Sequence, residues 1–515
     1  MSEIPEVLIF NTLHQGKVYK KHTQYPTEKH YLRISHNILF TLYKKRYSHI
    51  KQKRMKYYFL PIISLFIINA SCTMKKENVT ADTGEVKLIT LDPGHFHAAL
   101  VQKTSYPGVS KDVYVYSPGG ADLDEHLKRI EGYNSRQDQP TDWNEIVYTG
   151  TDFLDKMLSE KKGNVMITAG NNGKKTAYIR RTLDAGIHVL ADKPMAINTA
   201  DFEMLKECFE TAKQKDLLLY DIMTERFEIT TMLQKEFSRI PAVYGEQQPG
   251  TTDDPGIVKE SVHHFFKTVS GKPLIRPSWF FDVNQQGEGV VDVTTHLVDL
   301  VQWECFPEQI INQTDIELLD ANHWTTPMTL SEFKEVTGAD NYPAYLMKDV
   351  SNDTLHVYAN GNIFYTIKGI HAKVSVIWNY TYPEGGGDTH YSIMKGSKAH
   401  LIIQQGKEQN YKPVLYIKAT GMDTEAYEKD LQNSLASVTA KFPGIELKKI
   451  EKGTWEVQVP AKYHNGHEAH FGQVTENFLQ YLKEGRLPDW EVPNMLAKYY
   501  VTTHALEMAK AKNGK

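Results

Sequence analysis

The sequence predicts an α/β fold: a doubly wound parallel sheet, followed by an α+β domain with a mainly antiparallel sheet. The first observation is that short apolar segments alternate with helix-length segments between residues 86 and 220, as a parallel sheet with crossover helices requires. The second is a change in the sequence pattern after residue 228, where strand-like segments with alternating apolar and polar residues begin to dominate. Such alternation is typical of antiparallel strands with one buried face.

The elements follow in chain order. Strands of the first sheet are expected at residues 86–91, 112–116, 164–168, 187–190 and 217–220. A short Ala-rich helix should follow the first strand, and longer helices are expected at residues 174–185 and 201–215. In the second domain, strands are expected at 354–358, 363–367 and 372–378, and late helices at 471–482 and 492–511.

A titratable cluster follows a glycine-containing turn at residues 287–289. Asp292, His296 and Asp299 stand at i, i+4 and i+7, so their side chains would share one face if the segment is helical. The residues between them are mostly apolar, and a buried titratable cluster is costly unless it is paired or performs chemistry. The alternative is a helix N-terminus with His296 hydrogen-bonded in the core.

A second segment places Asp192, Lys193 and Pro194 directly after the apolar strand at 187–190. Pro194 fixes its own backbone and favours an extended conformation at Lys193. A lysine at the carboxyl end of a parallel strand points toward the crevice in which open α/β sheets bind ligands. The segment therefore indicates a binding or catalytic lysine.

Together these segments resemble the Gfo/Idh/MocA family of nicotinamide-dependent sugar and polyol oxidoreductases. That family carries a Glu-Lys-Pro turn and a glycine-rich turn leading into Asp-x-x-x-His-x-x-Asp. Residues 223–227, Met-Thr-Glu-Arg-Phe, resemble the family's Arg-Phe segment at the domain crossover. The resemblance covers the chain from about residue 86 onward. It implies a Rossmann-like nucleotide-binding domain at 86–227, a substrate and oligomerisation domain at 228–470, and C-terminal helices at 471–515 that pack near the first domain.

The resemblance also implies catalytic roles for three residues. His296 would be the general base, or the acid in the reverse direction, because histidine titrates near neutral pH. Lys193 would polarise the reacting oxygen and stabilise a developing alkoxide. Asp292 would orient the site and bind substrate hydroxyls, whereas Asp299 is expected to be structural.

The implied cofactor is NAD or NADP, yet the first turn departs from the family pattern. Of the usual Gly-x-Gly-x-x-Gly, only Gly94 remains; Asp92 brings negative charge toward a phosphate, and Pro93 removes an amide donor. The second strand ends without the acid that normally holds the ribose. The alternative is a turn that keeps the fold and has lost the cofactor. By resemblance, the cofactor-binding residues are Gly94, His95, Phe96, His97, Ser117, Thr168, Asn171, Asp192 and Lys193.

Aromatic residues beside cations and carboxylates favour a carbohydrate site, because a sugar ring stacks on an aromatic face while polar groups bind hydroxyls. The expected substrate residues are His263, His264, Lys267, Trp279, Asp388 and His390. The alternatives are an aromatic core edge and, for the segment around residue 388, a strand bulge. No metal site is expected: the histidines of residues 464–470 favour a hydrogen-bond network at a helix start.

The N-terminal residues resemble a targeting segment. Residues 55–72 have a basic start, a short apolar core and small residues before Cys72, as in a signal peptide with a lipoprotein cleavage site. Residues 1–54 are expected to be a non-native upstream extension and residues 73–85 a linker. We expect an exported, lipidated periplasmic or outer-membrane protein of a Gram-negative bacterium. The alternatives are a genuine basic extension with an anchor helix, and a cytoplasmic protein.

Charge and cysteine content limit the partners. Without residues 1–71 the chain has 47 basic and 60 acidic residues, which argues against nucleic acid or anionic lipid as a partner. A membrane would be contacted only through the lipid anchor. Cys208 and Cys305 alone make no disulfide framework. The sequence leaves open whether a homo-oligomer forms.

Three functions follow as hypotheses. The first is a nicotinamide-dependent oxidoreductase acting on a sugar or glycoside hydroxyl. The second is a redox-neutral glycoside hydrolase that oxidises the sugar transiently, with His263 or His390 as an additional base. The third is a carbohydrate-binding lipoprotein on a degenerate fold. Because an exported enzyme meets no evident pool of free nicotinamide, lipidation at Cys72 would favour a retained cofactor and the second hypothesis.

Overall fold

The computed structural model describes residues 85–269, 272–421 and 423–512, which belong to one compact unit spanning residues 78–515. The predicted signal peptide, the lipidation site Cys72 and most of the predicted linker lie outside the described residues. Within the described part, no helix is both long and apolar enough to span a bilayer.

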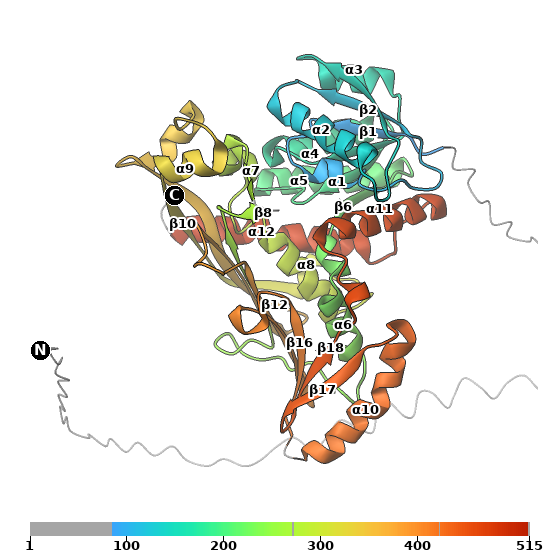
Figure 1. Cartoon of the computed structure of the whole chain (residues 1–515), viewed down its shortest axis with the longest axis vertical. Coiled ribbons are helices and arrows are strands. Elements are labelled where there is room, and N and C mark those ends of the chain that lie inside the picture. The colour runs from blue at the N-terminus through green and yellow to red at the C-terminus, as the bar shows by residue number, and fades with distance from the viewer. Residues whose placement is uncertain (1–84, 270–271, 422, 513–515) are drawn as a thin grey trace, which may run out of the picture. The chain divides into compact units, whose positions relative to one another are not determined.

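The first domain is built on a parallel sheet with the strand order β3-β2-β1-β4-β5-β6 (Figure 1). This order reverses between β1 and β4, which confirms the predicted doubly wound sheet. Its strands are β1 (Leu88–Leu91), β2 (Asp112–Ser117), β3 (Asn144–Thr149), β4 (Val165–Thr168), β5 (His188–Asp192) and β6 (Leu219–Ile222). Its helices are α1 (His97–Leu100), α2 (Ala121–Ser135), α3 (Phe153–Glu160), α4 (Asn172–Asp184) and α5 (Thr199–Gln214).

The strands that the sequence predicts best are the fully buried ones. Every residue of β1, β4 and β6 is buried, as parallel strands covered on both faces should be. The edge strand β3 was missed because it carries exposed residues on both sides of its apolar positions. The helix after β1 is also shorter than expected, since α1 comprises one turn of four residues.

The second domain contains a large mixed sheet with the order β10-β12-β13-β7-β14-β15-β16-β18-β17, and β11 pairs with β12. All of these pairs are antiparallel except β13 with β7, which confirms a mainly antiparallel sheet. The strands are β7 (Ile257–His264), β10 (Ile316–Thr329), β11 (Val350–Ser351), β12 (Thr354–Ile367), β13 (Ile370–Asn379), β14 (Thr389–Lys395), β15 (Ala399–Gln405), β16 (Val414–Ala419), β17 (Glu446–Glu451) and β18 (Thr454–Gln458). A two-residue pair, β8 (Thr268–Val269) and β9 (Lys272–Pro273), stands apart.

One strand replaces two predicted ones in this sheet. The segments at 354–358 and 363–367 belong to the single strand β12. Gly361 interrupts the apolar pattern because a Cβ there would lie 2.2 Å from Cγ2 of Val290. Gly361 therefore lets the turn before α8 (Thr294–Cys305) pack directly on the sheet.

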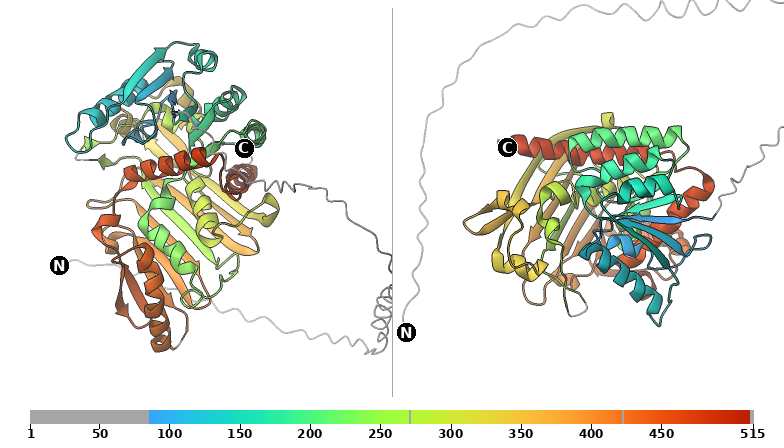
Figure 2. Two further views of the ribbon diagram at one scale, coloured as in Figure 1. Left: turned by 90° about the vertical axis from the view of Figure 1, so that its right-hand side faces the viewer. Right: turned by 90° about the horizontal axis from the view of Figure 1, so that it is seen from above.

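Helices cover one face of the large sheet (Figures 1 and 2). α8 (Thr294–Cys305) contacts β13 and β7, and α12 (Glu491–Lys512) contacts β10, α8 and α5. α11 (His467–Glu484) contacts α1 and β6 of the first domain. The C-terminal helices thus join the two domains. The remaining helical elements are η1 (Thr224–Phe227), α6 (Ile229–Ser238), η2 (Ser278–Phe281), α7 (Val283–Gln286), η3 (Gln313–Asp315), α9 (Leu330–Thr337), η4 (Ala344–Asp349), η5 (Lys407–Gln409), α10 (Thr424–Lys441) and η6 (Ala461–Tyr463).

Candidate active site

A cavity of about 1070 Å³ lies between the first domain and the large sheet. Its walls come from the turn after β1, the end of β5, the start of α8, and strands β7 and β14. The structure thus brings together most of the residues that the sequence singled out. Those lining the cavity are His95, Phe96, His97, Asp192, Lys193, His263, Lys267, Asp292, His296, Asp388 and His390.

Lys193 and Asp292 form an ion pair that joins the two domains. Lys193 follows the last residue of β5, and its Nζ donates to Oδ1 of Asp292 at 2.7 Å. Gln286 Nε2 donates to the other carboxylate oxygen at 3.1 Å. Asp292 lies in the turn before α8, which begins at Thr294. Asp292 thus stands two residues before α8, where its N–H already bonds to the Glu288 carbonyl at 3.0 Å, and it lines the same cavity as His296.

His296 lies in the first turn of α8 and lines the same cavity. Burial, together with the nearby Lys193 ammonium, lowers the pKa of His296 to about 3. Its imidazole is therefore neutral at physiological pH. Nδ1 is buried and has no hydrogen-bond partner among the described residues. A neutral imidazole with a free nitrogen can accept a proton from a bound hydroxyl.

Asp299, the third member of the motif, belongs to a different cluster. Its carboxylate accepts two bonds from the Arg226 guanidinium, at 2.6 and 2.7 Å, and one from Lys498 Nζ at 2.9 Å. Arg226 also donates to Glu491 at 2.9 Å, and all four groups are buried. Asp299 therefore ties η1, α8 and α12 together and does not reach the cavity.

The opposite wall carries a second cluster around Asp388. This carboxylate lies 2.9 Å from His264 Nδ1 and 3.3 Å from His263 Nδ1, and it accepts a hydrogen bond from Lys267. Although burial would raise the pKa of Asp388, His263 and Lys267 lower it below its ordinary value. His390 contacts the Ser261 hydroxyl at 2.9 Å. This wall offers both charged and neutral hydrogen-bonding groups.

Two of the expected substrate residues do not line the cavity. Trp279 lies in η2, where its ring packs beside Gly94 and its Nε1 donates to Asp122 Oδ2 at 3.0 Å. It holds the second domain against the turn after β1, so the substrate prediction for Trp279 is not supported by its position. His264 is buried and supports Asp388 from within the sheet.

The expected cofactor residues divide into two groups. His95, Phe96, His97, Asp192 and Lys193 line the cavity, whereas four others are engaged elsewhere. Those are Gly94, Ser117, Thr168 and Asn171, of which Ser117 accepts from Gly119 N–H and Asn171 donates to Gln285.

The turn after β1 is built differently from an amide cradle for a diphosphate. The backbone N–H groups of Gly94 and His95 both donate to the Ala169 carbonyl at 3.1 Å. Gly94 still permits a close approach, since a Cβ there would lie 3.3 Å from Cα of Gly170. The backbone amides of Gly94 and His95 are therefore already used within the chain.

Sequence reasoning missed several groups in or beside the cavity. Lys175 is fully buried in α4, where its Nζ donates to Asn172 Oδ1 at 2.5 Å and to the Asp192 carbonyl at 2.8 Å. Burial lowers the pKa of Lys175 to about 8. Burial also raises the pKa of Glu228, which caps α6, to about 7. A lysine in a helical pattern normally indicates a solvent-exposed position, so only the tertiary structure shows that Lys175 is buried beside the cavity.

The histidine cluster at residues 464–470 reaches the same region. His467 Nδ1 lies 3.4 Å from Glu225 Oε1, and its ring lies 6.0 Å from that of His97. His470 Nε2 contacts Asn465 at 3.1 Å. Within the described residues, however, a different trio can hold a metal: His95, His97 and Asp192 place ligand atoms within 4.8 Å of one another.

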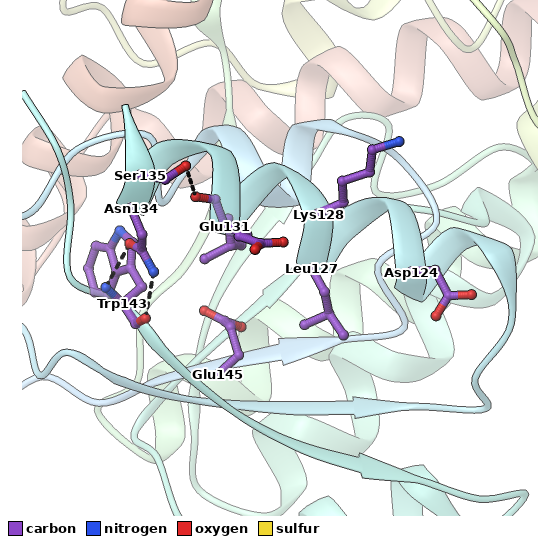
Figure 3. Close-up of a pocket in the computed structure, with 9 residues that line it drawn as sticks. Asp124, Leu127, Lys128, Glu131, Asn134, Ser135, Trp143 and Glu145 are labelled. Atoms are coloured by element: carbon purple, nitrogen blue, oxygen red, sulfur yellow. Dashed lines mark hydrogen bonds between the residues drawn. The ribbon is translucent and has the colours of Figure 1, made fainter. Parts of the chain in front are cut away.

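A shallower groove of about 610 Å³ lies elsewhere on the first domain, between α2 and the edge strand β3 (Figure 3). Asn134 donates to the Trp143 carbonyl at one end of it, and Glu145 and Asp124 also line it. None of the residues expected in the site lies there. The chemistry therefore belongs to the larger cavity.

Comparison with protein families gives two matches. Residues 233–510 match the family described as "Putative oxidoreductase C terminal domain". Residues 123–220 match "Oxidoreductase family, NAD-binding Rossmann fold". The second match begins after the turn at residues 92–97, which is the part that departs from the usual glycine pattern. No curated protein matches the chain.

Solved structures agree with these matches. A crystal structure titled as a putative oxidoreductase from Parabacteroides merdae ATCC 43184 is 71% identical, with a TM-score of 0.82, and covers 83% of this chain and 98% of its own. A putative oxidoreductase from Thermotoga maritima shares the fold at 14% identity and a TM-score of 0.53, over 84% and 99% of the two chains. Levoglucosan dehydrogenase, solved with NADH and L-sorbose, shares it at 11% identity and 0.54, over 83% and 97%. The chain belongs to the Gfo/Idh/MocA family of oxidoreductases, whose first domain is an NAD-binding Rossmann fold.

Proposed function

We propose that the protein oxidises a hydroxyl group of a sugar or glycoside, or reduces the corresponding ketone, with NAD or NADP. The observation that carries the proposal is the arrangement of the cavity walls. The Lys193–Asp292 pair and His296 come from the end of β5 and the start of α8, and the group formed by His263, Asp388 and His390 comes from β7 and the segment that leads into β14. A polyhydroxylated substrate can contact both groups at once.

The residues have distinct roles in this proposal. A nicotinamide held in the cavity beside Asp192 and Lys193 would supply the acceptor for the hydride that leaves the carbon carrying the reacting hydroxyl. The hydroxyl proton passes to the neutral imidazole of His296. The Lys193 ammonium lies where negative charge develops on the oxygen, and Asp292 holds that ammonium in place at 2.7 Å.

The opposite wall supports a carbohydrate as the substrate class. Asp388, Lys267 and His390 can accept or donate hydrogen bonds to ring hydroxyls. The Trp378 ring also lines the cavity, with the His263 ring stacked on it at 5.0 Å between centroids. Levoglucosan dehydrogenase, a neighbour in fold, was solved with L-sorbose bound, which agrees with this substrate class.

Two measurements test the proposal. The intrinsic fluorescence of the protein's tryptophans is followed while the purified full-length protein is titrated with NAD, NADP and their reduced forms. A panel of sugars, glycosides and keto-sugars is then incubated with the protein and the cofactor that binds. We expect binding, and turnover with at least one carbohydrate that is lost in His296→Asn. Sugar binding without any nucleotide binding would instead support a carbohydrate-binding protein.

One observation favours redox-neutral glycoside hydrolysis as a second candidate. His263 lines the cavity, and its Nε2 is buried and has no partner among the described residues. It could serve as the additional base that elimination of an aglycone requires. Release of free sugar without net formation of reduced cofactor would distinguish this reaction from simple oxidation, which leaves a keto-sugar.

The location of the protein remains a prediction from its N-terminal sequence. We propose export and lipidation at Cys72, with a cofactor that stays bound through the catalytic cycle. Cell fractionation and mass spectrometry of the mature N-terminus test this directly. A soluble cytoplasmic protein that exchanges NAD freely would contradict it.

A further inference from the structure

Three side chains with metal-ligating atoms converge at the first-domain end of the cavity. His95 and His97 come from the turn and the short helix after β1, and Asp192 is the last residue of β5. One ligand atom from each lies within 4.8 Å of the others. His95 and His97 stand in the turn after β1, which is glycine-rich in the family, so this turn carries coordinating side chains here.

The surrounding contacts leave the Asp192 carboxylate directed toward the histidines. Its Oδ2 lies 3.0 Å from Nδ1 of His97. The two nearby lysines are engaged differently: Lys193 donates to Asp292, and Lys175 donates to the backbone carbonyl of Asp192. The carboxylate can therefore serve as a ligand without breaking either lysine contact.

We propose that His95, His97 and Asp192 bind one divalent transition-metal ion. Two imidazoles and a carboxylate are the donor types that zinc and ferrous iron accept in catalytic sites, which keep positions free for water or substrate. All three residues line the cavity. The free positions therefore face the space that the proposed sugar would occupy, and the ligand class there is an oxygen atom of water or of a carbohydrate.

The turn itself supports a site of this kind. His95 and His97 are two residues apart, and their rings meet edge to face at 3.9 Å between centroids. The backbone is held in place, since Gly94 and His95 donate to Ala169 and Trp279 packs beside Gly94. A metal site needs ligands that are fixed before the ion arrives, and this turn provides that rigidity.

Cobalt binding tests the proposal without any nucleotide or sugar. The full-length protein is stripped with a chelator and titrated with Co²⁺, and the visible absorption of the bound ion is followed, with Zn²⁺ as the competitor. We expect one ion per chain. His95→Gln, His97→Gln and Asp192→Asn should each weaken binding at least about a hundredfold, because losing even a supporting residue around a metal costs 10- to 100-fold in affinity.

His464→Gln is the matched control, since His464 is an exposed histidine that also lines the cavity and is not in the trio. It should bind Co²⁺ as tightly as the wild type. Zn²⁺ should also raise the Tm of the wild type and of this control, but not of the three variants. This second readout compares each protein with itself, so loss of stability in a variant does not obscure the result.

Absence of a cobalt spectrum in the wild type would overturn the proposal, and so would equal affinity in all four variants. A hydrogen-bond network among His95, His97 and Asp192 would then be their whole role. These outcomes do not depend on the oxidoreductase proposal, because nicotinamide binding is measured separately in metal-free protein.

Discussion

Lys193 and Asp292 are 99 positions apart in the chain, and their side chains meet at 2.7 Å with both groups nearly buried. Lys193 follows strand β5 of the first domain, and Asp292 lies in the turn before α8 of the second. The pair therefore sets the positions of both walls of the cavity as well as the charge within it.

Removing either partner should impair catalysis more than binding. We expect Lys193→Met to lower kcat by about 10²- to 10³-fold, as the loss of one donor to a developing oxyanion does elsewhere. Asp292→Asn should lower kcat less, because the lysine remains but is no longer held. Since the two residues act as a unit, the double variant should be no worse than Lys193→Met alone. Strictly additive effects in steady-state kinetics would contradict this pairing.

Asp299 should matter for stability and not for chemistry. Its replacement by Ala leaves the charges of Arg226 and Lys498 buried and incompletely paired. We expect the free energy of unfolding to fall by about 3 to 5 kcal/mol, measured by denaturant titration. Nucleotide affinity of the folded fraction should be unchanged.

Glu125→Ala is the control for that experiment, because Glu125 pairs with Lys128 on an exposed helix surface at 3.5 Å. Exposed pairs contribute little, so no measurable change in stability is expected. If Asp299→Ala were equally neutral, the buried network would not contribute to stability as we infer.

The sequence was sufficient for the parts of the fold that depend on local pattern. Buried strands such as β1 and β4 are apolar except for one threonine each, and their alternation with helices predicts a parallel sheet. The edge strand β3 was missed because none of its residues is buried, and its apolar residues Ile146 and Val147 are themselves exposed. The length of β12 was missed because Gly361 interrupts the pattern for a tertiary reason, its contact with Val290.

Site residues that belong to a sequence motif beside a turn could be predicted. Site residues whose role depends on burial in the tertiary structure were missed. Lys193 and His296 could be found because each stands in a recognisable spacing beside a turn. Lys175 could not, because nothing in its own helix shows that the position is buried beneath Asp192. Trp279 was placed with the substrate because aromatic residues near charges suggest sugar binding, yet the same residue types also build domain contacts.

Acid should destabilise the protein through its buried histidines. Burial lowers the pKa of His390 to about 4, whereas an unfolded histidine titrates near 6.5. As the pH falls from about 6.5 toward 4, this histidine binds a proton in the unfolded state but not in the folded state. The free energy of unfolding therefore decreases. We expect His390→Asn to reduce this decrease in Tm. Identical pH profiles for wild type and variant would show that His390 is not the group responsible.

Glu228 should have the opposite pH dependence. Burial raises the pKa of Glu228 from its ordinary value of 4.5 to about 7, so between these values the folded state holds a proton that the unfolded state has already lost. Its contribution to stability is therefore complete below about pH 4.5 and is lost as the pH rises through 7. Glu228→Gln keeps an oxygen that can accept from the Thr230 and Thr231 amides and so preserves the cap of α6. The stability difference between the variant and the wild type should grow in favour of the variant from pH 5 to 8. A difference that is constant across this range would mean that Glu228 does not bind a proton in the folded protein.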